Sequence, residues 1–176
     1  MIENKVAEQK LNESMRRLGE LHLEKARACA VQIYSIGSAD TPELWSNKFR
    51  EDLIVNLLDF GFHARRVLSL AEIEISNGWR EKFSTTRNPR ALTYEIEENY
   101  SYCLNYLHHM TGFGMIPTVI DGRKMWAQNI DEHQLRFVAV KSDKYPSRTI
   151  DIVALAAAFL GDGIIAIKNT RPEWRF

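Results

Sequence analysis

The residues best equipped for chemistry lie in one short segment, from Tyr102 to His109. Asn105 and His109 are four residues apart, so a helix places both on one face. Tyr102 and Tyr106 lie beside them on that face. An amide, a phenol and an imidazole near a helix end suit acid–base work on a polar ligand, because histidine exchanges its proton near neutral pH. The alternative is that these residues belong to an ordinary bundle helix and hydrogen-bond to neighbouring helices.

A second candidate is the stretch from residue 79 to residue 90, in which aromatic residues alternate with cations and hydroxyls. Single-stranded nucleic acid binds such a mixture, because cations hold phosphates and aromatic rings stack on bases. We expect Arg87 and Arg90 to contact the nucleic acid. Arg65 and Arg66, on the preceding helix, are the other cations expected near the same ligand. The alternative is that at least one of them pairs with Glu72 or Asp59 on a solvated surface. The alternative is a solvated loop whose aromatic side chains pack into the core.

The other histidines and the cysteines favour structural roles. His22 lies on an apolar helical stripe, which indicates a satisfied core or interface histidine. Cys29 and Cys103 both fall in apolar helical patterns, so we expect two buried thiols and no disulfide. His133 follows two acidic residues, but neighbours on a loop rarely converge on one metal. The chain has no glycine-rich phosphate loop, nucleophile elbow or paired-cysteine motif, and we predict neither a metal nor a cofactor.

Three long helices are expected to carry these candidates. Apolar residues at three- and four-residue steps predict a first helix over residues 5–36. A second is expected from Thr41 to about residue 75, and a third from Asn88 to about residue 111, closed by glycines. In the second and third helices the first residue named caps the helix through its side chain. A proline follows it, because the N–H that proline lacks would have no partner in the first turn of a helix. The first helix is too long for its own bundle to cover, which predicts a homo-oligomer.

The apolar spacing changes after the third helix. We expect a hairpin over 116–128, a strand over 135–140, a short buried helix over 149–160 and a last strand over 164–167. The predicted fold is therefore mainly α: a helical bundle at residues 1–113, followed by a small mixed α/β segment at 114–176 that packs on it.

Composition limits the classes of function. The 176 residues carry 23 basic and 23 acidic side chains. A net charge of zero argues against an electrostatic grip by the whole protein on nucleic acid or membrane, and leaves room for a local basic patch. Residues 1–10 are charged, unlike a signal peptide, and the apolar stretch 150–160 is too short to span a bilayer. We expect a cytoplasmic protein without a membrane partner.

The segment from Leu104 to His109 resembles the hallmark of HEPN-domain proteins, in which arginine and a polar residue precede a histidine late in a helix. Asn105 and His109 match by position, and Leu104 stands where the arginine belongs. Residues 59–66 are also similar to the family, and the resemblance covers about residues 41–111. It implies a helical bundle and a metal-independent ribonuclease of the kind found in toxin–antitoxin and phage-defence systems.

The resemblance also implies roles for residues. His109, with Asn105, would assist proton transfer at the ribose hydroxyl or the leaving oxygen, and Tyr102 would contact the RNA. An arginine would hold the phosphate, which leucine cannot do. Either one of the arginines named above substitutes, or the site binds RNA without cutting it, or the likeness is accidental.

RNA binding or cleavage is therefore our first hypothesis. The alternative is a non-enzymatic interaction or regulatory protein that uses its long first helix and its C-terminal sheet for partner contacts. A third hypothesis is a small-ligand sensor with a pocket around Tyr102, Asn105 and His109.

Overall fold

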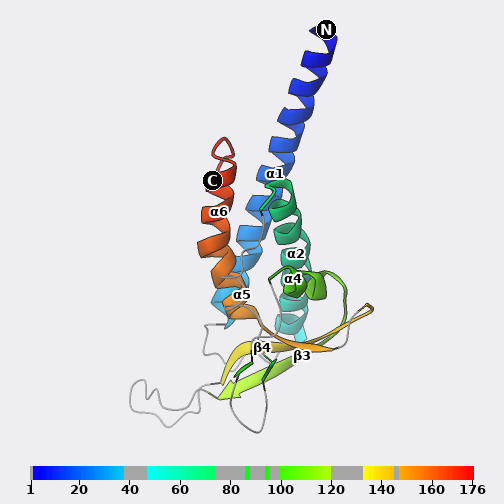
Figure 1. Cartoon of the computed structure of the whole chain (residues 1–176). Coiled ribbons are helices and arrows are strands. Elements are labelled where there is room, and N and C mark those ends of the chain that lie inside the picture. The colour runs from blue at the N-terminus through cyan, green and yellow to red at the C-terminus, as the bar shows by residue number, and fades with distance from the viewer. Residues whose placement is uncertain are drawn as a thin grey trace.

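The computed structural model describes residues 2–37, 47–73, 86–87, 94–95, 100–119, 133–144 and 147–176 (Figure 1). Its elements, in chain order, are α1 (Ile2–Gly37), α2 (Asn47–Leu70), β1 (Thr86–Arg87), β2 (Tyr94–Glu95), α4 (Tyr100–His108), β3 (Met110–Val119), β4 (His133–Ser142), β5 (Arg148–Asp151), α5 (Ile152–Ala158), η2 (Phe159–Gly163) and α6 (Ile164–Thr170). Helices dominate and a small sheet follows them, which confirms the predicted mainly α fold class.

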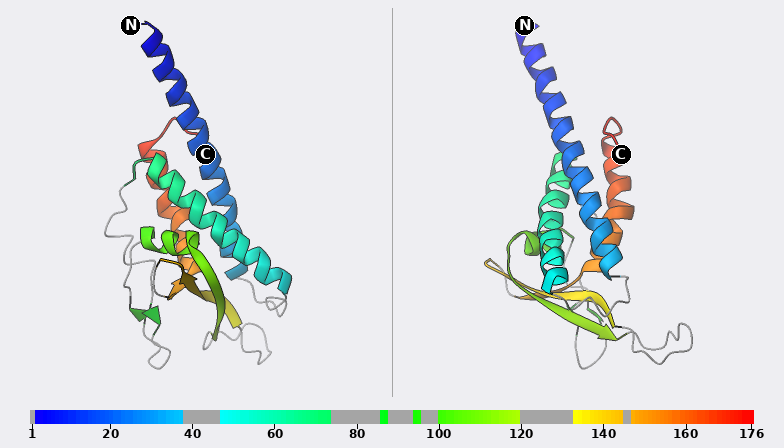
Figure 2. Two further views of the ribbon diagram at one scale, coloured as in Figure 1. Left: turned by 90° about the vertical axis from the view of Figure 1, so that its right-hand side faces the viewer. Right: turned by 180° about the vertical axis from the view of Figure 1, so that it is seen from behind.

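The helices form two layers around α1. The α2 helix and then α4 lie on one side of it, and the segment α5–η2–α6 lies on the other (Figures 1 and 2). The strands β3, β4 and β5 form an antiparallel sheet in chain order at one end of this bundle. The N-terminal part of α1 extends beyond the other elements, and its residues 6–15 are all exposed.

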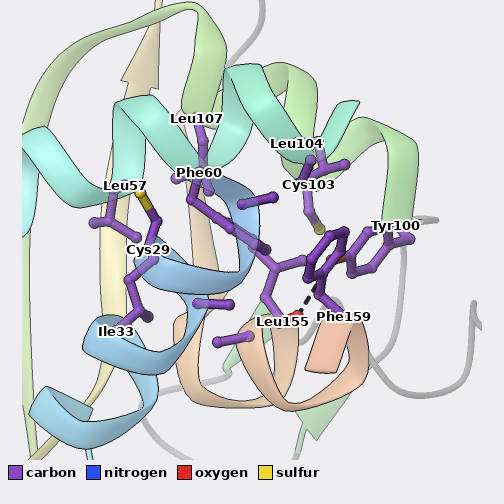
Figure 3. Close-up of a cluster of buried hydrophobic side chains, with 14 of the residues drawn as sticks. Cys29, Ile33, Leu57, Phe60, Tyr100, Cys103, Leu104, Leu107, Leu155 and Phe159 are labelled. Atoms are coloured by element: carbon purple, nitrogen blue, oxygen red, sulfur yellow. Dashed lines mark hydrogen bonds between the residues drawn. The ribbon is translucent and has the colours of Figure 1, made fainter. Parts of the chain in front are cut away.

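One apolar core joins the helices to the sheet. Tyr100, Cys103 and Leu104 of α4 meet α2 on one side and Leu155 and Phe159 on the other (Figure 3). The Tyr100 hydroxyl donates a hydrogen bond to the carbonyl oxygen of Leu155 at 3.3 Å. Full burial raises the pKa of this phenol well above its ordinary value, so the hydroxyl stays a donor. The expected boundary between residues 113 and 114 falls inside β3.

The cysteine prediction is confirmed: Cys29 and Cys103 are buried free thiols. The first helix is also confirmed, and α2 agrees with the second helix over residues 47–70. The predicted strand 135–140 lies within β4. Residues 38–46 and 120–132 lie outside the described residues, and with them the cap of the second helix and the predicted hairpin turn.

Two predicted elements are wrong. The third helix begins at Tyr100 and not at Asn88. The short strand β2 lies within the stretch expected to be helical and pairs with β1, just before Asn88. Thr93 and Tyr94 are residue types that favour strands, so periodicity alone was misleading there. The third helix also ends at His108, since the glycines after it lie in β3.

The other wrong element is the last strand, because Ile164–Thr170 is the helix α6. The π-helical turn η2 carries α5 through its glycines into α6, and the result is one continuous helix. This helix, Ile152–Thr170, is long and apolar enough by composition to cross a membrane; an 18-residue window of it has a mean hydropathy of 1.7, and 39% of that window is buried in the fold. The argument that the apolar stretch 150–160 is too short to span a bilayer therefore does not apply to the complete helix.

The C-terminal tail packs back onto α1. The ring of Trp174 is buried against Gly19, where a side chain would collide with it. Arg171 reaches Glu72 at 2.8 Å, just past the end of α2. Glu72 has a φ of 57°, and the N–H of Ile73 bonds to the carbonyl of Leu68, as in a Schellman C-cap. The contact from Arg171 thus helps to hold Glu72, which is not a glycine, in the left-handed backbone conformation.

Candidate functional site

The site begins with the close approach of α2 to α4 at Gly61. A Cβ atom at this position would lie 2.8 Å from Leu107 Cβ and 3.0 Å from the backbone nitrogen of His108. Glycine therefore lets α4 lie directly on α2, and the last turn of α4 comes to rest beside the next residue, Phe62. This contact places side chains of the two helices on one surface.

Four of the five histidines of the chain lie along that surface with Phe62 between them. We call them the histidine row; it consists of His22 from α1, His63 from α2 and His108 with His109 at the end of α4. Ring-centroid distances between successive members, counting Phe62, are 4.9, 5.1, 5.6 and 4.8 Å. Phe62 stacks on His108 at an interplanar angle of 29°.

At the α1 end of the row, the Nδ1 atoms of His22 and His63 are 2.8 Å apart, a hydrogen-bond distance. His22 is only 7% exposed, so the prediction of a satisfied core histidine is confirmed. Burial, the neighbouring His63 and then Arg66 lower the pKa of His22. Burial also lowers the pKa of His63; Asp59 opposes this and Lys25 adds to it.

At the other end of the row, His109 is held on three sides. Its N–H donates to the carbonyl of Asn105 at 3.0 Å, and its own carbonyl accepts from the N–H of Asp143 at 3.3 Å. The ring Nδ1 lies 3.7 Å from Asp143 Oδ1. A carboxylate beside one ring nitrogen orients the imidazole and directs the other nitrogen elsewhere. Ser142 accepts from the N–H of Lys144 at 3.1 Å, and so fixes the turn that carries Asp143.

His108 has a different electrostatic setting from its neighbour. Burial lowers the pKa of His108, and the charges of His109, Arg65 and Lys144 lower it further. A lowered pKa leaves this imidazole neutral near pH 7, in the form that accepts a proton. Cations from α2 and from the turn after β4 therefore act on the same ring.

The predicted site residues are brought together in part. Arg65 acts on the α4 end of the row and Arg66 on the α1 end. Tyr102 is 49% exposed, two helical turns before His109 on the same face of α4. Asn105 precedes His109 by one turn, but its Oδ1 atom is buried without a hydrogen-bond partner among the described residues.

Leu104 shows why the motif arginine has no counterpart here. It is 1% exposed and belongs to the core, and its carbonyl faces Gly61. An arginine at this position would enter the core, so a cation for this site has to come from another element. The side chain of Arg87 and the whole of Arg90 lie outside the described residues, as does the side chain of His133.

The distances do not suit a metal. Two nitrogen ligands about 2.0–2.1 Å from a tetrahedral zinc lie roughly 3.3 Å apart, further than the two Nδ1 atoms of His22 and His63. In the part of the chain that the structure describes, no three histidine, cysteine or acidic side chains cluster as metal ligands.

The row runs from the buried His22 to the partly exposed rings of His63, His108 and His109, with the exposed Phe62 among them. A groove of about 850 Å³ is lined by α1 and the tail, among them Leu21, Val31 and Phe176. Two smaller grooves lie between α1 and the tail, around Arg16 and Glu173. Small-molecule sites are usually enclosed pockets, whereas a row of partly exposed rings suits an extended ligand.

The sequence placed His108 in the candidate segment, but it did not indicate that Phe62 and His22 belong to the same site as His63 and His108. His22 and His63 are 41 residues apart, and only the register of α1 on α2 brings them together. Two features of the sequence could have indicated this site: His22 lies on the same apolar stripe as core residues, and His63 lies beside Arg65 and Arg66. Comparison of the chain with protein-family models, with curated proteins and with solved structures finds no match.

Proposed function

We propose that the histidine row binds single-stranded RNA and that its α4 end cuts the strand without a metal. The observation that supports this most is the pair His108 and His109, whose ring centroids are 4.8 Å apart, beside two cations. RNA carries its own nucleophile, the 2′-hydroxyl. Cleavage therefore needs only a base, an acid and positive charge near the phosphate.

Each residue has a role in this proposal. His108, kept neutral, takes the proton of the 2′-hydroxyl as its oxygen attacks phosphorus. His109, oriented by Asp143, gives a proton to the departing 5′-oxygen. The products are a 2′,3′-cyclic phosphate and a 5′-hydroxyl. Arg65 and Lys144 would face the phosphate, the role that the resemblance to HEPN proteins gives to an arginine.

Two exposed aromatic rings suit the bases on either side. Phe62 is 44% exposed and lies against His108, and Tyr102 is 49% exposed on α4. Tyr102 and His109 are seven residues apart, about 10 Å along a helix, so a base stacked on Tyr102 would belong to a nucleotide next to the cut. Stacking requires unpaired bases, and single strands are therefore the expected substrate.

The wild-type protein is expected to bind mixed single-stranded RNA and to cut it in EDTA. Arg65→Gln should lower the slope of log affinity against log salt by about one, because one phosphate contact is lost. The matched control is Arg27→Gln, an exposed arginine on the α1 face that lines the tail groove. Fluorescence anisotropy at several salt concentrations measures the salt dependence of RNA binding by both variants. Equal slopes for the two variants would contradict the proposed interface.

The second candidate, an interaction protein, has one observation in its favour. The projecting part of α1 exposes Leu11 and Met15, which continue the stripe that packs on α2 through His22 and Cys29. A second copy of the same arm is the partner that we propose. It would leave the histidine row open.

Sedimentation at high micromolar concentration is expected to show a dimer. Leu11→Lys combined with Met15→Lys should shift it to monomer, since each puts a charge into the apolar contact. Val55→Lys, at an equally exposed apolar position on α2, should leave it unchanged. A wild-type protein that sediments only as monomer argues against self-association through α1.

A further inference from the structure

His22 and His63 meet across the α1–α2 interface in a geometry that depends on their protons. With the two Nδ1 atoms 2.8 Å apart, one must donate and the other accept. A first added proton enters at Nε2 of the donor ring and leaves the hydrogen bond intact. A second proton can enter only at the accepting Nδ1. It places two N–H groups and two positive charges against each other.

The surrounding charges decide which ring of the pair donates the hydrogen bond and which accepts it. Asp59, one turn before His63 on α2, favours positive charge on His63, although Lys25 of α1 opposes it. Arg66 disfavours charge on His22, which is also buried. His63 is therefore the donor that takes the first proton, and His22 is the acceptor.

Two further titratable groups adjoin the pair. Cys29 on α1 is subject to the charges of Asp59 and Lys25, and burial raises the pKa of its thiol, so it stays neutral in acid. His108 on α4 touches the other face of the row through Phe62. Protonation of His108 adds positive charge to the same surface and does not relieve the repulsion between the pair.

We propose that the His22–His63 pair is a proton-operated latch, which holds the middle of α1 on α2 with at most one added proton and opens when a second is bound. Opening would release α1 next to its projecting arm. The inference rests on the contact between two helices and is independent of RNA cleavage.

The sign of the pH dependence follows from burial. The pKa values of both rings lie below the ordinary 6.5 in the folded chain. Below that pH the unfolded chain binds more protons than the folded one. The latch is therefore closed above about pH 6.5, and its contribution to stability is lost as the pH falls further.

A double-mutant cycle of His22→Gln and His63→Gln, measured by urea unfolding, tests the latch. At about pH 8 the two substitutions should be coupled by about fivefold in the unfolding constant, the size of one hydrogen bond. At about pH 5 the coupling should vanish or change sign. A parallel cycle of His22→Gln with His109→Gln should show no coupling at either pH, because these two rings do not touch.

Proton NMR of the wild-type protein supplies a readout that needs no variant. The His63 ring is expected to titrate at higher pH than the His22 ring, and the second step should coincide with faster amide exchange around His22 in α1. Coupling of equal size at both pH values would overturn the latch. So would independent titration of the two rings with no change in exchange.

Discussion

His109→Ala is expected to reduce RNA cleavage in EDTA by about 10²- to 10⁴-fold, the usual contribution of one acid–base group. The substitution removes the ring that Asp143 holds at 3.7 Å, beside the last turn of α4. RNA affinity should change little, because the cations remain in place. Quantified gels of a labelled single strand measure the rate, and anisotropy measures the binding.

His108→Ala should cause a loss of similar size with a different pH signature. As the proposed base, His108 must be neutral, so it should set the acid limb of the wild-type rate profile, at a pH below the ordinary 6.5 because its pKa is lowered. Residual cleavage by the His108 variant should lack that limb. Cleavage at the wild-type rate in both alanine variants would remove the catalytic proposal and leave a binding surface.

Gly61→Ala is expected to destabilise the fold by about 1 kcal/mol, the typical overpacking cost of about 2 kcal/mol less the helical preference of alanine. The new Cβ would lie 2.8 Å from Leu107 Cβ and 3.1 Å from the carbonyl oxygen of Leu104. Neither atom is the end of a flexible side chain, so α4 must move away from α2. The overpacking cost exceeds the roughly 1 kcal/mol that alanine gains over glycine inside a helix.

Gly161→Ala is the matched control for this substitution. A Cβ there meets nothing within 4 Å among the described atoms, so the helical preference of alanine should leave stability unchanged or slightly higher. Urea unfolding compares the two variants. Because α4 carries His108, Gly61→Ala should also slow any RNA cleavage. Equal stability of the two variants would show that the α2–α4 contact is looser than described.

Sequence periodicity predicted the helices but not how far one helix is shifted along another. The α1 stripe was readable because its apolar residues recur over roughly seven turns, and the burial of Ile33 and Leu57 follows from such stripes. The pairing of His22 with His63 depends on how far α2 slides along α1, and no local pattern encodes that distance. The histidine row therefore emerged only once three helices were packed.

The local sequence pattern also gave a wrong prediction where the same residues suit both a helix and a strand. The Asn88-Pro89 start and the apolar spacing after it favoured a helix, yet β2 pairs with β1 there and α4 begins only at Tyr100. Tertiary context overrides weak helical preference there, since Thr93, Tyr94 and Ile96 also suit a strand. Similarly, the short helix expected over residues 149–160 does not end there, because a π-helical turn carries the helix through Gly161.

The sequence by itself determined the class of fold, the first two helices, the buried thiols and the concentration of polar groups around His109. These depend on residue type and on spacing along one element. Only the tertiary structure decided which histidines meet, that Leu104 belongs to the core, and that Arg65 acts on His108. These depend on distances between elements, which are set by the packing of α1, α2 and α4 around Gly61 and the core.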